Sequence, residues 1–124
     1  MRQISINRRS NRILYNVTVS LEAAIFPEWL GFMREDHIPK ILATGCFSGY
    51  KICRILDEST EIYSVAIQYF APTSQHFENY TATHAPRLQR EYIAKFGADA
   101  PAFRTILHAI EEGEVISDIE PSKN

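Results

Sequence analysis

Histidine is the residue type in this chain most suited to chemistry, and two histidines stand in the same short phrase, His37-Ile38-Pro39 and His84-Ala85-Pro86. An imidazole changes protonation near neutral pH, so a histidine in a pocket can act as a general base, a ligand or a hydrogen-bond donor. Each of the two also follows an apolar helix position, Met33 or Tyr80, by four residues. A histidine that ends a helical turn can simply bond a free backbone carbonyl. Both interpretations stay open, and His84 and His37 are candidate catalytic residues.

Three further side chains are candidates for contacting a ligand: Arg87, Arg104 and Tyr15. Arg87 directly follows Pro86, at the expected start of a helix, where the helix dipole disfavours a cation unless an anion lies nearby. Arg104 is a long cation in the last expected strand, and Tyr15 is a phenol in the first. Pairing of Arg104 with a carboxylate such as Glu61 would equally account for its presence.

Several well-known site motifs are missing from the sequence. There is no Gly-x-Gly for a phosphate or dinucleotide, no Gly-x-Ser-x-Gly elbow, and no His-x-x-x-His or Glu-x-x-His pair for a metal. The two cysteines cannot make a four-thiolate zinc site or a disulfide framework. We therefore expect neither a metal nor a cofactor.

Composition narrows the class of protein. The chain has 124 residues, 45% of them hydrophobic, and a formal charge of −2, which suits one globular domain. No basic stripe of the kind that nucleic-acid binding requires is present in the body of the chain. No apolar run approaches the ~18 residues that would span a membrane, nor is there a signal-peptide core. We expect a cytoplasmic protein without nucleic-acid or membrane partners.

The two ends of the chain differ from its middle. The basic residues of the N-terminal segment stand among Ser and Asn; they are Arg2, Arg8, Arg9 and Arg12. Residues 1–11 are predicted to be a disordered extension, and residues 111–124 a flexible acidic tail. The folded domain is expected to span residues 12–110.

Hydrophobic periodicity predicts the order strand, helix, strand, strand, helix, strand. The strands are expected near residues 12–21, 47–56, 61–70 and 100–109, and the helices near 26–37 and 74–96. The first helix is expected to end near His37, because Pro39 disfavours helical geometry at the residue before it. Two such split units make a ferredoxin-like α+β sandwich, a four-stranded antiparallel sheet with both helices on one face. The first and last strands are not expected to pair, so Asn16 and Arg104 need not converge.

The second and third strands are predicted to be apolar on both faces. One face would carry Ile52, Leu56 and Phe70, and the other Tyr63, Ile67 and Tyr69. Since the helices cover one face only, something must cover the other, and a second copy of the chain could do so with one self-complementary patch. This predicts a homodimer with facing sheets, in the manner of dimeric α+β barrels.

A set of short motifs, taken together, resembles the pattern of a small bacterial domain-of-unknown-function family, number 4286 (DUF4286). The motifs are Tyr15-Asn16-Val17-Thr18-Val19, Trp29, Met33, His37-Ile38-Pro39, Leu42-Ala43-Thr44-Gly45, Phe47, His84-Ala85-Pro86-Arg87-Leu88, Phe96-Gly97 and Phe103-Arg104-Thr105. The resemblance covers about Ile13 to Leu107, nearly the whole chain. It implies membership of an uncharacterised family and brings no known activity.

Two functions are compatible with these observations. The first is a homodimeric module, not an enzyme, that binds a small ligand or a protein. The alternative is a small pocket enzyme of the cofactor-free or haem-degrading monooxygenase type. In such α+β barrels an Asn on the first strand and a His on the second helix face one pocket, and Asn16 and His84 occupy comparable elements. A cavity between helices and sheet that holds several of the candidate residues would favour the enzyme.

Overall fold

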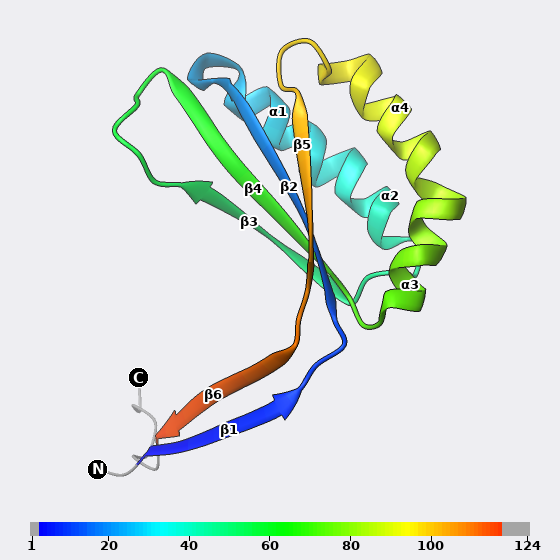
Figure 1. Cartoon of the computed structure of the whole chain (residues 1–124). Helices are drawn as coiled ribbons and strands as arrows, with labels where there is room; N and C mark the ends of the chain where they lie inside the picture. Colours follow the sequence, from blue (N-terminus) through cyan, green and yellow to red (C-terminus); the bar gives the residue numbers. More distant parts are fainter. Residues whose placement is uncertain (1–2, 118–124) are drawn as a thin grey trace.

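The computed structural model describes the backbone of residues 3–117 and the side chains of residues 9–116. Arg2 and residues 118–124 lie outside the described part of the chain. A four-stranded antiparallel sheet forms one layer, with strands in the order β3 (Gly49–Ile55), β4 (Ile62–Ala71), β2 (Ile13–Glu22) and β5 (Ala102–His108). Both helical segments lie on one face of this sheet (Figure 1). The predicted ferredoxin-like sandwich is confirmed.

Strand β2 is one of the two inner strands of the sheet, and it pairs with β4 on one side and with β5 on the other. The prediction that the first and last strands would not pair is therefore wrong. Each strand–helix–strand unit leaves a one-strand gap between its two parallel strands, and a strand of the other unit fills that gap. The interleaving places Val17 of β2 opposite Arg104 of β5.

Each of the two helical segments is one helix with a wide π-turn in its middle. The first runs through α1 (Phe26–Phe32), a π-turn at Met33–His37 and α2 (Ile38–Leu42). The second runs through α3 (Ser74–Asn79), a π-turn at Tyr80–His84 and α4 (Ala85–Phe96). Each His-x-Pro phrase therefore marks the end of a π-turn rather than the end of a helix.

Pro39 predicts that the first helix ends near His37, and this prediction is wrong. The N–H of Ile38 donates to the carbonyl of Met33, five residues earlier, and Ala85 does the same to Tyr80. Proline ordinarily breaks a helix because it lacks an N–H and its ring collides with the carbonyl four residues before it. A five-residue turn widens the helix at this point, so that the proline is accommodated and the helix continues.

Alternation along the strands decides which side chains face the helices. On β2 and β4 the odd-numbered residues face the helices. Ile52 of β3 is paired with Ile67 of β4 and therefore faces the helices too. The prediction that Ile52 and Leu56 share a face with Phe70 is wrong: Phe70 lies on the opposite, open face, and Leu56 follows the end of β3 and is 90% exposed. The open face is consequently mixed in polarity rather than uniformly apolar.

The two ends of the described chain form a second, two-stranded sheet. Strand β1 (Gln3–Arg9) pairs antiparallel with β6 (Glu111–Ser117), and the ribbon extends away from the helices (Figure 1). Arg12 anchors its base, since Nε and Nη2 donate to the two carboxylate oxygens of Glu112 at 2.8 and 2.6 Å, and Ser10 donates to the same carboxylate. The prediction of a disordered segment 1–11 and a flexible tail 111–124 does not hold for residues 3–9 and 111–117. Strands about a hundred residues apart carry no local sign of their pairing.

A chain of buried hydrogen bonds ties the two helices and the loop before β5 together. Trp29 Nε1 donates to the hydroxyl of Tyr92 at 3.0 Å, and that hydroxyl donates to the carbonyl of Ala100 at 2.6 Å. Trp29 and Ala100 are fully buried.

Within residues 3–117, no helix combines the length and the hydrophobicity needed to cross a bilayer.

Replacement of Tyr92 by Phe should lower the free energy of unfolding by about 1 to 3 kcal/mol, because it leaves the buried Trp29 N–H and Ala100 carbonyl without a partner. Urea denaturation followed by circular dichroism measures the loss. The matched control is Tyr50→Phe, at a tyrosine that is 41% exposed, and it should change stability by less than about 0.5 kcal/mol. Equal stability of the two variants would contradict the role given to the Tyr92 hydroxyl.

Candidate functional site

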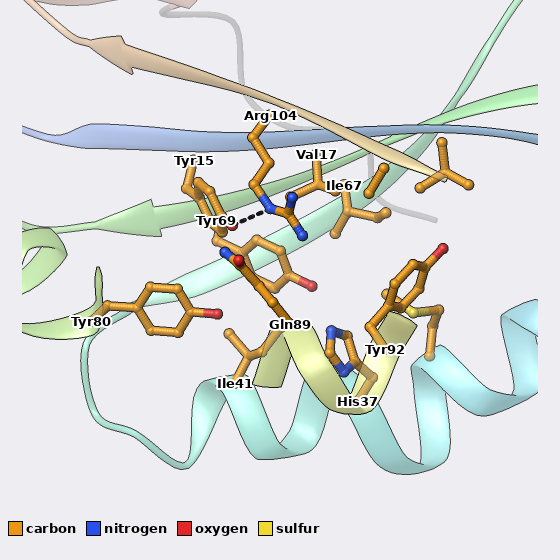
Figure 2. Close-up of a pocket in the computed structure, with 13 residues that line it drawn as sticks. Tyr15, Val17, His37, Ile41, Ile67, Tyr69, Tyr80, Gln89, Tyr92 and Arg104 are labelled. Carbon is orange, nitrogen blue, oxygen red and sulfur yellow. Dashed lines mark hydrogen bonds between the residues drawn. The ribbon is translucent and has the colours of Figure 1, made fainter. Parts of the chain in front are cut away.

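A cavity lies between the helices and the sheet, beside the centre of β2 (Figure 2). Its empty volume is about 380 Å³, including the part open to solvent. With the side chains as they stand the enclosed part is narrow, with room for a few water molecules. The apolar walls are Val17, Val19, Met33, Ile41, Ile67 and Ala102. The polar and aromatic lining is Tyr15, His37, Tyr69, Tyr80, Gln89, Tyr92 and Arg104.

His37 is 8% exposed, and its ring points from the first helix toward the sheet (Figure 2). The ring lies between Phe32 and Tyr92, with centroids 5.8 and 5.4 Å away. Within the described residues, no side chain or backbone group makes a hydrogen bond with its nitrogens. The aim of the ring follows from the π-turn, which His37 ends. His37 is thus a buried polar group whose hydrogen-bonding capacity is directed into the cavity.

Burial keeps His37 neutral at physiological pH. The pKa falls from the ordinary 6.5 to about 4, first because burial disfavours the charged ring. The carboxylates of Asp36 and Glu91 act in the opposite direction, and the cations Lys40 and Arg104 lower the pKa slightly further. A neutral imidazole offers one donor and one acceptor to whatever occupies the cavity.

Three tyrosines form the wall opposite His37. The ring of Tyr15 packs against those of Tyr69, Phe77 and Tyr80, with centroids 5.9, 5.3 and 5.7 Å away. The hydroxyls of Tyr69 and Tyr80 make no hydrogen bond with any described residue. Burial raises the pKa of both phenols well above its usual value, so both stay protonated and able to donate.

Arg104 reaches the cavity from the edge strand β5. Its Nε donates to the hydroxyl of Tyr15 at 2.9 Å, and its guanidinium points toward the helices (Figure 2). Pairing with Glu61 does not occur. The contact follows from the register of β2 and β5, in which Arg104 is opposite Val17. Val17 is two residues from Tyr15, so Arg104 and Tyr15 lie on the same face of the sheet and are diagonal neighbours.

The structure brings together half of the residues that the sequence singled out. His37, Tyr15 and Arg104 line the cavity. Asn16 lies on the open face of the sheet, where its amide donates to Thr18 at 3.2 Å. His84 ends the second π-turn, half-buried, with its ring 6.5 Å from that of Tyr80, and it does not line the cavity.

Arg87 is exposed on α4 and pairs with Glu91 across one helical turn at 3.4 Å. The helix runs continuously into α4 through the π-turn. The argument that a cation at a free helix start needs an anion therefore does not apply to Arg87. Its partner Glu91 also accepts from Lys40 at 2.9 Å, so this group is a solvated ionic network outside the cavity.

Sequence reasoning missed Tyr69, Tyr80 and Gln89 as lining residues. The alternation of β4 already placed Tyr69 with Ile67, and a correct strand order would have brought that face under the helices. Tyr80 and Gln89 gave no such signal, because the π-turn shifts the faces of the second helix by one residue relative to a regular 3.6-residue period.

In the part of the chain that the structure describes, no three His, Cys, Asp or Glu side chains are grouped so as to hold a metal ion.

The fold and the cavity define a class: a small ferredoxin-like α+β domain whose cavity lies between its helices and its sheet. Residues 12–110 match the family described as Domain of unknown function (DUF4286), and the chain belongs to that family. The resemblance noted from the sequence motifs is thereby confirmed. No curated protein is detectably similar in sequence.

Solved structures share the fold at low sequence identity. An ethyl tert-butyl ether d (EthD) family protein from Bacillus halodurans C-125 has a TM-score of 0.61 at 9% identity, covering 79% of this chain and 99% of its own. An EthD-like protein from Ralstonia eutropha JMP134 has a TM-score of 0.58 at 12% identity, covering 80% and 92%. A dimeric ferredoxin-like protein from an uncultured marine organism has a TM-score of 0.54 at 11% identity, covering 82% and 97%. At these identities the likeness is one of fold alone.

The lowered pKa of His37 makes stability depend on pH in a defined window. Between pH 6.5 and about 4 the unfolded chain binds the His37 proton and the folded chain does not, so the free energy of unfolding should fall as the pH falls through this window. Over the whole window, His37 should change the free energy of unfolding by about 3 kcal/mol. Urea denaturation at a series of pH values measures the slope for the natural chain and for His37→Phe.

The variant should lose this part of the slope, while carboxylates that titrate in the same range contribute equally to both proteins. His108→Gln, at an exposed histidine, is the matched control and should keep the natural slope. Parallel profiles for the natural chain and His37→Phe would show that His37 is not held neutral by the fold.

Proposed function

We propose that this protein is a homodimeric binding domain that takes up a small organic molecule in the cavity between its helices and its sheet. One observation carries the proposal: His37 is nine-tenths buried, has no hydrogen-bond partner among the described residues, and points into a cavity that opens to solvent. The ring nitrogens keep contact with solvent in the cavity, since no fully buried side-chain nitrogen or oxygen of the described residues lacks a hydrogen-bond partner. A ligand that displaces this solvent would have to offer His37 a hydrogen bond in its place.

The rest of the lining supports a small-molecule site. Such sites are concave and mostly apolar, with a few polar groups that fix the orientation of the ligand. Here the hydroxyls of Tyr69 and Tyr80 and the amide of Gln89 converge on the same apolar space as His37 (Figure 2). The aromatic packing around Tyr15 fixes that wall, so the room for a ligand would come from the side of the cavity that opens to solvent.

The alternative of a monooxygenase-like pocket enzyme rested on Asn16 and His84 facing one cavity. Asn16 lies on the far side of the sheet from the helices, and His84 lies outside the cavity. The arrangement thus offers no support for an enzyme built on that pair, and binding is the function that we propose.

The open face of the sheet is the surface that we assign to a second copy of this chain. On that face Phe103 is 73% exposed and Leu107 is 44% exposed. The partly buried Leu14 is opposite Leu107 on one side and Phe70 on the other. An apolar face next to polar side chains can be covered by its own copy across a two-fold axis, because one patch then serves both subunits. The likeness in fold to a dimeric ferredoxin-like protein supports this choice.

Native mass spectrometry of protein purified from cells tests the binding proposal. The natural chain should carry additional mass from a retained molecule, and His37→Phe should lose most of it, since phenylalanine keeps the ring packing and removes both hydrogen-bonding atoms. His84→Phe is the matched control, because that histidine does not line the cavity and the variant should retain the molecule. No added mass in the natural chain, or equal loss in both variants, would count against the proposed site.

Sedimentation analysis tests the dimer. The natural chain should sediment as a dimer at micromolar concentration, and Phe103→Glu should raise the dissociation constant by a factor of about 100, because it buries a charge in the interface. Ile93→Glu, at a residue of α4 that is 61% exposed and lies on the helical side of the sheet, is the control and should remain dimeric. A natural chain that sediments as a monomer at tens of micromolar would remove the dimer from the proposal.

A further inference from the structure

The charge of the cavity lining points to the class of ligand. Among the described residues that line it, Arg104 alone carries a formal charge at neutral pH, because His37 is neutral and the phenols stay protonated. No carboxylate lines the cavity. The lining therefore has a net charge of +1, which an anionic ligand would complement.

Arg104 has no ionic partner among the described residues, in contrast to Arg12, Arg87 and Lys40. Arg12 pairs with Glu112, and Arg87 and Lys40 pair with Glu91. No carboxylate of the described residues lies within ion-pair distance of Arg104, whose hydrogen bond goes to the neutral Tyr15. Since Nε makes that bond, the two terminal amino groups of the guanidinium remain available to an incoming group.

A second hollow leads to Arg104 from the solvent side. It lies between β5 and α4, has an empty volume of about 550 Å³ including open solvent, and is lined by Tyr92, Ile93, Gly97, Pro101, Ala102 and Arg104. The inner cavity shares Tyr92, Ala102 and Arg104 with it. Because β5 is an edge strand, no further strand of the sheet closes this side. Arg104 thus stands between the solvent-facing groove and the inner cavity.

We propose that the ligand is a small carboxylate with an apolar body, which enters along the groove between β5 and α4 and is held by the terminal amino groups of Arg104. This inference rests on the proposed binding function and adds the chemical class of the ligand. A planar guanidinium fits a carboxylate with two parallel hydrogen bonds, which a point charge cannot match. The apolar body would lie against Val17, Ile41 and Ile67. The neutral ring of His37 and the hydroxyls of Tyr69 and Tyr80 would donate to the carboxylate oxygens.

The neutrality of the other polar groups limits the charge of the ligand. A second negative charge would have no cation to meet it inside the cavity, and an unpaired charge is costly to bury. The site is therefore matched to a monoanion rather than to a dianion such as a phosphate ester.

Calorimetric titration with benzoate and with benzamide, at constant ionic strength, tests the inference. The two probes have nearly the same shape and differ in charge. Benzoate should bind at least tenfold more tightly, a difference of about 1.4 kcal/mol, since hydrogen bonds to a charged group are stronger than those to a neutral one. Arg104→Gln should bring benzoate to the affinity of benzamide and leave benzamide unchanged, and Arg104→Lys should restore part of the preference.

Arg87→Gln is the matched control, because it removes an arginine of the molecular surface that already has a carboxylate partner; it should keep the natural preference. If benzamide binds as tightly as benzoate, or if Arg104→Gln keeps the preference for benzoate, the assignment of a carboxylate is wrong while the binding function stands. If neither probe binds, the molecule retained from cells decides: a retained organic acid supports the inference, and a retained neutral molecule overturns it. Absence of both probe binding and a retained molecule removes the binding function, and the inference with it.

Discussion

Strand β2 is hydrogen-bonded on both sides, to β4 and to β5, and the position of every other part of the domain depends on this double pairing. It sets the alternation by which Tyr15 and Val17 face the helices and Asn16 faces away. It also brings a residue near the C-terminal end of the domain, Arg104, against one near its start, Tyr15. A slip of one residue in either ladder would turn each side chain of that strand to the other face and dismantle the cavity.

The second determinant is the low polarity of the space between helices and sheet. Burial there raises the pKa of Tyr69 and Tyr80 and lowers that of His37, so groups that could carry charge are held neutral. An isolated guanidinium at the rim of such a space interacts with an anion more strongly than it would in open water. Arg104 is therefore the one described residue of the cavity lining that carries a formal charge at neutral pH.

Much of the fold could be predicted from the residues alone. The β-branched runs and the stripe of Trp29 and Met33 gave the element order and the ferredoxin-like class. The strand neighbours follow from that class, because its two interleaved units place the first and last strands side by side. The prediction that these strands are unpaired is what separates Tyr15 from Arg104 in the sequence analysis. Pro39 was read as a helix terminator, because a local rule cannot anticipate that a π-turn will accommodate it. The β1–β6 ribbon was missed because residues that pair at its ends carry no local signature of each other.

A π-turn is a helix that holds one residue more than its hydrogen-bond pattern needs. Loss of a single residue between Met33 and Ile38 would convert the five-residue hydrogen bond between them into a regular four-residue one and leave the helical parts on either side where they lie. The same loss in a regular turn would rotate everything after it by about 100°. A relative of this protein could therefore be one residue shorter at this turn and keep the same interior, but not in the regular turns beside it.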